Sequence, residues 1–455
     1  MSKLTSLKIS ISGVRGVVGE TLTPQLVTSF AAAFGSYAGR GPILVGTDTR
    51  PSRHMVKQAV IAGLLGTGAS VIDLGICPVP SIQFRVKGRR GFGGIAITAS
   101  HNPVEWNALK FIGPQGLFLN QYRAEELLDV YHQGEYRHVG DAELRGVSCD
   151  EGAFEAHMAA ILKLVDKERI ARCGFRVAVD CVNGAGAPTT PKLLEALGCR
   201  FVALNIDVDK PFAHDPEPVA QNLTQLVETA SREKVDIGFA QDADADRLAV
   251  VSPTRGAIGE EYTVALAAKQ VLKRWKGPVV VNLSTTMLVE DIAREAGVPV
   301  YRTPVGEINV TEKLLAVDGA VGGEGNGGVI VPAVHACRDS FTGIALILEL
   351  LAEEERSLDE LIDSLPRYHI VKRKAPCPSD KVFFVLRGIE RSLAGGASID
   401  RSDGVRLTWP DKWLQVRPSN TEPIVRVIAE ARDPRTAQEL AERSLEVVEE
   451  AAARR

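Results

Sequence analysis

The sequence predicts an α/β protein made of three similar mixed-sheet domains, a smaller α+β C-terminal domain and a central active-site cleft. Three observations support this class. The chain has 455 residues, roughly three times the size of an average domain. A pattern of strand, turn, helix, glycine and strand recurs three times, which is typical of βαβ units. The residues after about position 366 follow a different, antiparallel pattern.

The three copies of the pattern share short apolar strands without polar alternation, which indicates strands covered on both faces. In the first copy the strand 43–45 precedes a helix from about Arg53 and a second strand at 71–72. In the second copy the strand 177–179 precedes a helix at 191–198 and a strand at 201–202. The third copy runs through 279–281, a helix near 288–296 and a strand at 298–300. Each copy predicts two parallel neighbouring strands.

These patterns predict domains at 1–150, 151–252, 253–366 and 367–455. A helix at about Phe154–Arg169 is expected to open the second domain. The proline-punctuated stretch Leu365–Pro378 predicts a linker. After it, the segments VRLTWPDKWLQVRPS and IVRVIAEA predict antiparallel strands, and the Ala/Glu-rich end predicts an amphipathic helix from Arg435.

Composition limits the classes of function. Apolar residues make up 45% and charged residues 24%, as in average soluble proteins. The start alternates like a strand and lacks the apolar core of a signal peptide, so we expect a cytoplasmic protein. A net charge of −4 without a basic stripe argues against nucleic-acid and membrane partners. Seven cysteines without a CxxC pair predict reduced core thiols and no structural zinc.

An acidic segment follows the strand-like residues 235–239. Asp242, Asp244 and Asp246 are spaced two apart, so a loop at a strand end can converge them on one hard cation. Their oxygen-only donors favour Mg²⁺ over zinc. An EF-hand is excluded because its sixth residue would be Arg247 and its twelfth Pro253. The alternative is a solvated acidic turn.

A second loop presents a hydroxyl after the strand-like residues 94–97. Ser100 can act as a nucleophile or phosphate carrier, and His101 beside it can transfer a proton. The absence of a GxSxG motif disfavours an acyl-transfer hydrolase. Turn capping is the alternative interpretation of the pair.

Two more loops are suited to sugar and phosphate. The glycine-rich segment 322–328 places Glu324 and Asn326 where the backbone can approach a ligand, and Glu324 can accept hydrogen bonds from two hydroxyls. A flexible hairpin is the alternative. The segment 417–423 combines guanidinium, hydroxyl and amide groups, with Arg426 just beyond, which is phosphate-binding chemistry. A surface turn is the alternative.

Taken in order, the four loops resemble the signature set of the α-D-phosphohexomutase superfamily over essentially the whole chain. The resemblance implies that Ser100 is a phosphoserine and that Asp242, Asp244 and Asp246 hold Mg²⁺ together with its phosphate. It implies catalytic roles for Arg15, His101, Lys110 and Arg247. It further implies sugar binding by Thr303, Val305, Gly306, Glu324 and Asn326, and phosphate binding by Arg417, Ser419, Asn420, Thr421 and Arg426. Many relatives carry Ser at the position of Asn326 and His at the position of Gly328, so a proton-transfer role for that His has no candidate here.

The implied activity is the interconversion of hexose 6-phosphate and hexose 1-phosphate through a bisphosphorylated sugar. The loops GEGNGG and RPSNTEP most resemble those of phosphoglucosamine mutases, and phosphoglucomutase/phosphomannomutase is the alternative. A non-catalytic sugar-phosphate sensor and a Mg²⁺-dependent phosphatase are alternatives of other classes. The expected partners are the hexose phosphate and the hexose 1,6-bisphosphate intermediate, and either a monomer or a homodimer is compatible with the sequence.

Overall fold

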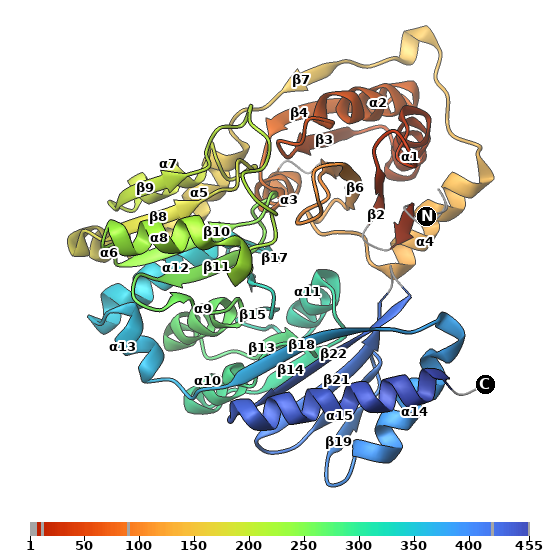
Figure 1. Ribbon diagram of the computed structural model, residues 1–455. Coiled ribbons are helices and arrows are strands. Elements are labelled where there is room, and N and C mark those ends of the chain that lie inside the picture. The colour runs from red at the N-terminus through yellow and green to blue at the C-terminus, as the bar shows by residue number, and fades with distance from the viewer. Residues whose placement is uncertain (1–6, 11–12, 89–91, 420–422, 454–455) are drawn as a thin grey trace. The chain divides into compact units, whose positions relative to one another are not determined.

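The computed structural model describes residues 7–10, 13–88, 92–419 and 423–453. Two compact units divide the chain, and neither is continuous in sequence. Unit 1 comprises 1–270 and 326–359, and unit 2 comprises 271–325 and 360–455. Helices and strands alternate through both (Figure 1).

The first sheet of unit 1 contains seven strands in the order β1-β2-β6-β5-β3-β4-β7. Its strands are β1 (Lys8–Ser10), β2 (Gly13–Val17), β3 (Pro42–Thr47), β4 (Ser70–Ile76), β5 (Gly93–Ile97), β6 (Trp106–Ile112) and β7 (Val147–Cys149). The helices that accompany it are α1 (Pro24–Ala38), α2 (Arg53–Gly66), α3 (Val79–Gly88) and α4 (Gln121–Gln133). Strand β3 pairs in parallel with β4 and β5, whereas β6 pairs antiparallel with β2 and β5. The sheet is therefore mixed, as expected.

Alternation along β3 explains why this sheet is covered on both faces. Ile43 and Val45 lie in one apolar cluster with residues of α1 and α2. Leu44, between them, lies in a second cluster with residues of α3. Because neighbouring side chains of a strand point to opposite faces, the continuous apolar run of β3 requires helices on both sides.

The second sheet of unit 1 has the order β12-β11-β10-β8-β9. Its strands are β8 (Arg176–Asp180), β9 (Arg200–Leu204), β10 (Ile237–Gln241), β11 (Leu248–Ser252) and β12 (Gly256–Ala257). Unit 1 also holds α5 (Ala153–Leu164), α6 (Lys167–Cys173), α7 (Thr190–Ala196), α8 (Thr224–Arg232), α12 (Ser340–Glu354) and the antiparallel pair β16 (Gly328–Val331) and β17 (His335–Arg338). Helix α9 (Glu261–Arg274) begins in unit 1 and ends in unit 2.

Unit 2 contains the third predicted βαβ unit and a C-terminal sheet. In the βαβ unit, β13 (Val279–Asn282) lies between β14 (Val300–Thr303) and β15 (Val321–Glu324), parallel to both, with helices α10 (Leu288–Ala296) and α11 (Glu307–Ala316). The C-terminal sheet has the order β18-β22-β21-β20-β19. Its elements are β18 (His369–Pro376), β19 (Ser398–Asp400), β20 (Val405–Thr408), β21 (Lys412–Pro418), β22 (Ile424–Ala431), α14 (Val382–Leu393) and α15 (Pro434–Ala453). Helix α13 (Leu358–Asp363) lies at the boundary of the two units in sequence.

The three predicted βαβ units are confirmed, with parallel strand pairs in each. The expected antiparallel strands and helix at the C-terminal end are also present. No helix among the described residues is long and apolar enough to cross a membrane.

Three local predictions are wrong. The single helix expected at about 154–169 is two helices, because the side chain of Asp166 accepts a hydrogen bond from Arg169 N and caps the start of α6. The expected linker 365–378 contains β18, which pairs with β22 along its whole length. Its terminal Pro376 is tolerated because β18 is an edge strand. Of the thiols expected in the core, Cys149 and Cys173 are exposed.

Candidate active site

The serine loop leaves the end of β5 in a constrained conformation. Ser100 is buried and has φ = 50°, a left-handed conformation that is uncommon outside glycine and often marks a functional position. Its N–H donates to Thr98 Oγ1 at 3.0 Å, and Thr98 Oγ1 donates to Asp48 Oδ2 at 2.7 Å. The loop thus presents its hydroxyl from a fixed backbone.

The buried side chain of Arg50 holds the rest of this loop. It donates to the carbonyl oxygens of Ser100 at 2.6 Å, Asn102 at 2.7 Å, Pro103 at 2.5 Å and Trp106 at 2.9 Å. Its Nε also pairs with Asp48 Oδ2 at 2.9 Å. Sequence reasoning missed Arg50. The available signal was an Asp-Thr-Arg tripeptide directly after the apolar strand β3.

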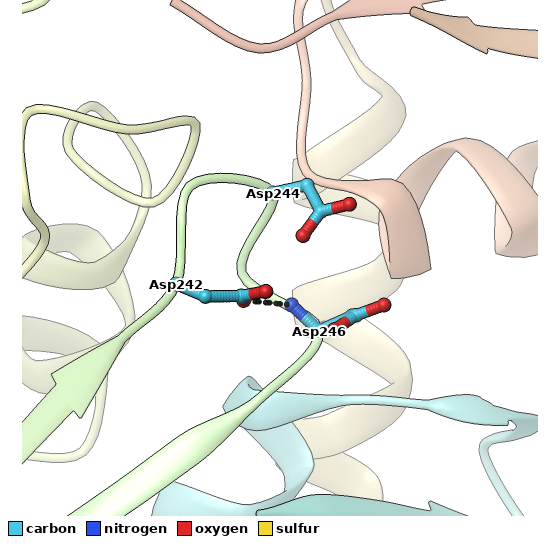
Figure 2. A group of neighbouring side chains, drawn as sticks. All are labelled: Asp242, Asp244 and Asp246. Carbon is cyan, nitrogen blue, oxygen red and sulfur yellow. Dashed lines mark hydrogen bonds between the residues drawn. The ribbon is translucent and has the colours of Figure 1, made fainter. Parts of the chain in front are cut away.

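The acidic loop connects β10 to β11, and Figure 2 shows its three carboxylates grouped on one turn. All three are buried. Asp242 Oδ1 accepts hydrogen bonds from the backbone N–H groups of Asp246 and Arg247, each at 3.1 Å. One oxygen from each aspartate lies within 4.8 Å of the others. A solvated acidic turn, the alternative interpretation, would expose these carboxylates to water. Their burial and the backbone hydrogen bonds to Asp242 argue against it.

The serine and acidic loops meet within unit 1. Ser100 Oγ donates to Asp242 Oδ2 at 2.7 Å, although the two residues are 142 apart in sequence. Lys110, on β6, donates from Nζ to Asp244 Oδ2 at 2.7 Å and lies 4.0 Å from Asp246 Oδ2. A hydroxyl, three carboxylates and an ammonium group therefore share one buried site.

A second cation of this site was not predicted. Arg338, at the end of β17, donates from Nη2 to Asp246 Oδ2 at 2.5 Å. The position gave little signal in sequence because it lies outside all four motifs. Together, Lys110 and Arg338 offset part of the charge of the three aspartates.

Burial and the neighbouring charges shift the pKa values of Asp242 and Asp244 in opposite directions. Burial raises the pKa of Asp242 well above its ordinary value, and the charges of Asp244 and Asp246 raise it further. Burial also acts on Asp244, but Lys110 and Arg338 are among the groups that outweigh it and hold the pKa of Asp244 below its ordinary value. Three buried carboxylates this close repel one another, so the site favours a further positive charge.

The donor set fits a hard divalent cation. Asp244 Oδ1 and Asp246 Oδ1 are buried and accept no hydrogen bond, a costly state for carboxylate oxygens that a metal ligand would relieve. The three aspartates offer only oxygen, as Mg²⁺, Ca²⁺ and Mn²⁺ prefer. The cluster can therefore bind a metal ion.

Three further predicted residues lie around the serine and acidic loops. Arg15, on β2, donates from Nη1 to Asn102 Oδ1 at 2.5 Å. Arg247 Nε lies 3.9 Å from Asp246 Oδ1. The charge of Arg247, followed by burial and Arg15, lowers the pKa of His101 well below its ordinary value. The Nδ1 atom of His101 is buried and makes no hydrogen bond.

The predicted sugar residues lie mainly in unit 2. Glu324 is the last residue of β15, and its Oε1 accepts from Asn282 Nδ2 at 2.9 Å and Gly306 N at 3.0 Å. Thr303 ends β14, and its hydroxyl donates to Pro304 O at 3.1 Å. Asn326 lies in unit 1 and accepts from Gly328 N at 3.3 Å. The expected loop 322–328 is shorter than predicted, because residues 322–324 belong to β15 and residue 328 to β16.

Three of the predicted phosphate residues, Arg417, Ser419 and Arg426, lie near the end of β21 and the start of β22. Arg417 and Arg426 are directly paired across these strands. Ser419 N donates to Ile424 O at 2.9 Å. Asn420 and Thr421 lie outside the described residues. Two arginines of the predicted set are therefore neighbours on paired strands of unit 2.

Known proteins resemble the chain along its length. Family models match as phosphoglucomutase/phosphomannomutase alpha/beta/alpha domain I at 7–138, domain II at 155–256, domain III at 259–368 and C-terminal domain at 371–447. A phosphoglucomutase/phosphomannomutase of Thermococcus kodakarensis is 39% identical, covering 96% of this chain and 98% of that one. A Methanopyrus kandleri protein named "Probable phosphoglucosamine mutase" is 36% identical, covering 96% of each chain.

A solved structure shows the same similarity in three dimensions. It is a phosphoglucomutase/phosphomannomutase family protein from Burkholderia thailandensis, with a TM-score of 0.86 and 26% identity. The superposition covers 98% of this chain and 99% of that one.

Proposed function

The chain belongs to the phosphoglucomutase/phosphomannomutase family of phosphohexomutases, and we propose that Ser100 carries the phosphoryl group that it transfers. The observation that carries this proposal is the 2.7 Å hydrogen bond from Ser100 Oγ to Asp242 Oδ2. It joins the nucleophilic loop to a cluster able to hold a metal ion. A phosphatase would have no need for a separate loop that binds a second phosphate.

The proposed reaction has two balanced transfers. The phosphoryl group of phosphorylated Ser100 moves to the free hydroxyl of a hexose monophosphate. That hydroxyl loses its proton, and Ser100 Oγ gains one. The resulting bisphosphate then presents its other phosphoryl group to Ser100, which loses its proton again while the sugar hydroxyl is restored. The isomeric monophosphate leaves, and Ser100 is phosphorylated again.

We assign Mg²⁺ to Asp242, Asp244 and Asp246, together with an oxygen of the seryl phosphate. When bound, the ion offsets the negative charge that spreads over the phosphoryl oxygens during transfer. Its hard-cation character matches the two carboxylate oxygens that accept no hydrogen bond.

Side chains around the site supply the remaining charge and the proton. Lys110 and Arg247 provide fixed positive charge beside the phosphoryl group. Arg15, which donates a hydrogen bond to Asn102 of the serine loop, adds a further positive charge there. His101 directly follows the nucleophile Ser100 in sequence and is one candidate for proton transfer. Lys110 is the other candidate for proton transfer, because it is buried beside the reacting oxygens.

The predicted sugar and phosphate residues, all in unit 2 except Asn326, are assigned to the substrate. Glu324 accepts hydrogen bonds from two ring hydroxyls, and the 303–306 loop with Asn326 accompanies it. Arg417, Ser419, Asn420, Thr421 and Arg426 bind the phosphate that is not being transferred. These roles, like the domain boundaries near 150, 252 and 366, rest on the sequence motifs.

For the substrate, we propose glucosamine 6-phosphate, converted to glucosamine 1-phosphate. The support is the GEGNGG and RPSNTEP loops and the relative named as a phosphoglucosamine mutase. The relative with 39% identity is named phosphoglucomutase/phosphomannomutase, so glucose and mannose phosphates are the second candidate. Neither relative carries the name of a non-catalytic sensor.

One assay series tests the carrier and the substrate. Initial rates with glucosamine, glucose and mannose 6-phosphates are measured for the wild type and Ser100→Ala, with trace hexose bisphosphate and Mg²⁺ present. Intact-mass and peptide mass spectrometry then locate phosphate. We expect the highest kcat/KM with glucosamine 6-phosphate, phosphate on the peptide containing Ser100, and loss of turnover in Ser100→Ala. Full activity of the alanine variant would refute the carrier, whereas a preference for glucose or mannose would refute only the substrate.

A further inference from the structure

Asp403 connects two segments of unit 2 that form separate motifs in the sequence, the 303–306 loop and the segment that begins at Arg417. Its Oδ2 accepts a hydrogen bond from Arg417 Nε at 2.9 Å and another from the backbone N–H of Val305 at 3.0 Å. Val305 and Arg417 are more than a hundred residues apart in sequence. One carboxylate oxygen thus connects the 303–306 loop to the first arginine of the 417–423 segment.

The position of Asp403 is fixed by its surroundings. Gln415 Nε2 donates to the carbonyl oxygen of Asp403 at 3.1 Å, and Ser284 Oγ donates to Gln415 Oε1 at 2.6 Å. Next to it, Gly404 has φ = 72°, and a Cβ there would lie 2.2 Å from Val416 O and 2.7 Å from Arg417 Cα. Only glycine allows the turn to pack this closely against β21. The carboxylate of Asp403 therefore meets Arg417 at a set position.

The contact at Nε determines how Arg417 can bind an anion. A guanidinium group is planar and rigid, so a hydrogen bond at Nε orients the plane and leaves the two terminal nitrogens for a bidentate contact. The same carboxylate holds Val305, and the next residue, Gly306, donates its N–H to Glu324 Oε1. A continuous path of hydrogen bonds then leads from Arg417 through Asp403 and the 305–306 backbone to Glu324.

We propose that Asp403 is a positioning residue. It orients Arg417 for phosphate binding and holds it at a constant distance from the sugar-binding residues Val305 and Glu324. This inference rests on the proposed function. In that reaction the substrate binds in two orientations, as 6-phosphate and as 1-phosphate. A fixed distance between the phosphate-binding Arg417 and the sugar-binding residues Val305 and Glu324 suits both orientations. Loss of Asp403 therefore weakens the binding of both sugar phosphates to the same extent.

A double-mutant cycle tests the connection. Binding of glucosamine 6-phosphate and glucosamine 1-phosphate is measured by isothermal titration calorimetry in a Ser100→Ala background, which prevents turnover. To this background are added Asp403→Asn, Arg417→Ala, or both. Asp400→Asn is the matched control, because Asp400 ends the neighbouring strand β19, is exposed and accepts hydrogen bonds from the backbone N–H and the hydroxyl of Ser402. Asp403→Ser is a second variant, and thermal unfolding confirms that each variant is folded.

We expect Asp403→Asn to weaken binding of both sugar phosphates about tenfold, and Arg417→Ala by at least as much. The double variant should bind no more than about twofold weaker than Arg417→Ala, because Asp403 acts through Arg417. In enzyme with Ser100 intact, KM should rise in both directions while kcat changes little. Asp400→Asn should match its parent.

Two results would overturn the inference alone: wild-type binding in both Asp403 variants, or single effects that multiply in the double variant. Failure of the Ser100→Ala parent to bind any of the glucosamine, glucose or mannose phosphates would instead refute the proposed function, and the role of Asp403 with it.

Discussion

Arg338 reaches Asp246 by passing over Gly328. Its Nη2 lies 2.5 Å from Asp246 Oδ2, and a Cβ on residue 328 would lie only 2.4 Å from Arg338 Cδ. The absence of a side chain at 328, where many superfamily members carry His, therefore gives the arginine its path to the acidic loop. The buried guanidinium group of Arg338 thus contacts the acidic loop, and position 328 holds glycine in place of a histidine.

Gly328→Ala should accordingly displace Arg338. Since the neighbouring backbone and side chains are buried, we expect a loss of about 1–3 kcal/mol in the free energy of unfolding. Denaturant unfolding measures it. In an Arg338→Ala background the same change should cost clearly less, because the clashing stem is gone. Equal costs in the two backgrounds would contradict the packing described here.

Asp244→Asn keeps the size of the side chain but removes one charge from the triad. We expect Mg²⁺ affinity and turnover to fall together, and raised Mg²⁺ to restore part of the activity. Calorimetric titration with Mg²⁺ gives the affinity independently of turnover. Asp209→Asn is the control, because Asp209 is exposed in the same unit. A wild type that stays fully active in a strong chelator would rule out the metal site.

Arg50→Ala should destabilise the serine loop, because it removes a donor from four backbone carbonyls and leaves Asp48 without its cation. Breaking a buried ion pair in this way costs about 3–5 kcal/mol of unfolding free energy. Arg50→Lys should recover less than half, since a point charge cannot serve four acceptors. Arg53→Ala is the matched control, because Arg53 donates to one carbonyl, that of Thr49. A cost for Arg50→Ala no larger than this control would refute the role of Arg50.

His335 predicts an acid sensitivity that is separate from catalysis. Its Nε2 bonds to Gly116 O at 2.9 Å, its Nδ1 is buried without a partner, and burial lowers its pKa to about 4. The unfolded chain, with an ordinary pKa near 6.5, binds more protons than the folded protein between pH 6.5 and 4. Stability from this group is therefore complete above pH 6.5 and is lost as the pH falls toward 4, by at most about 1.4 kcal/mol per pH unit.

Denaturant unfolding of the wild type and His335→Gln at pH 7.5, 5.5 and 4.5 measures this effect. Glutamine retains a donor for Gly116 O but does not titrate, so its stability should fall less steeply with acid. His54→Gln, at an exposed histidine of α2, is the matched control. Parallel slopes for wild type and His335→Gln would contradict the prediction.

The sequence alone determined the local elements and the chemistry of the loops. The βαβ units at 43–72, 177–202 and 279–300 were predicted correctly, because apolar periodicity and glycine stops act over a few residues. The oxygen donors at 242, 244 and 246 and the hydroxyl of Ser100 were identifiable for the same reason, since spacing and residue type are local properties.

Tertiary structure decided which of these groups meet and what supports them. Ser100 and Asp242 are 142 residues apart, and Lys110 and Asp244 are 134 apart. Arg338 and Asp403 carry no local signal of their role, and the Asp-Thr-Arg tripeptide that contains Arg50 does not reveal its partners, because a buried ion pair depends on a partner brought close only by packing. The same holds for β18, whose polar, proline-ended sequence becomes a strand only because β22 offers a complete row of hydrogen-bonding partners. Local patterns select the element and the donor type, whereas long-range packing selects the partner, and the partner determines the charge, orientation and burial of each group in the site.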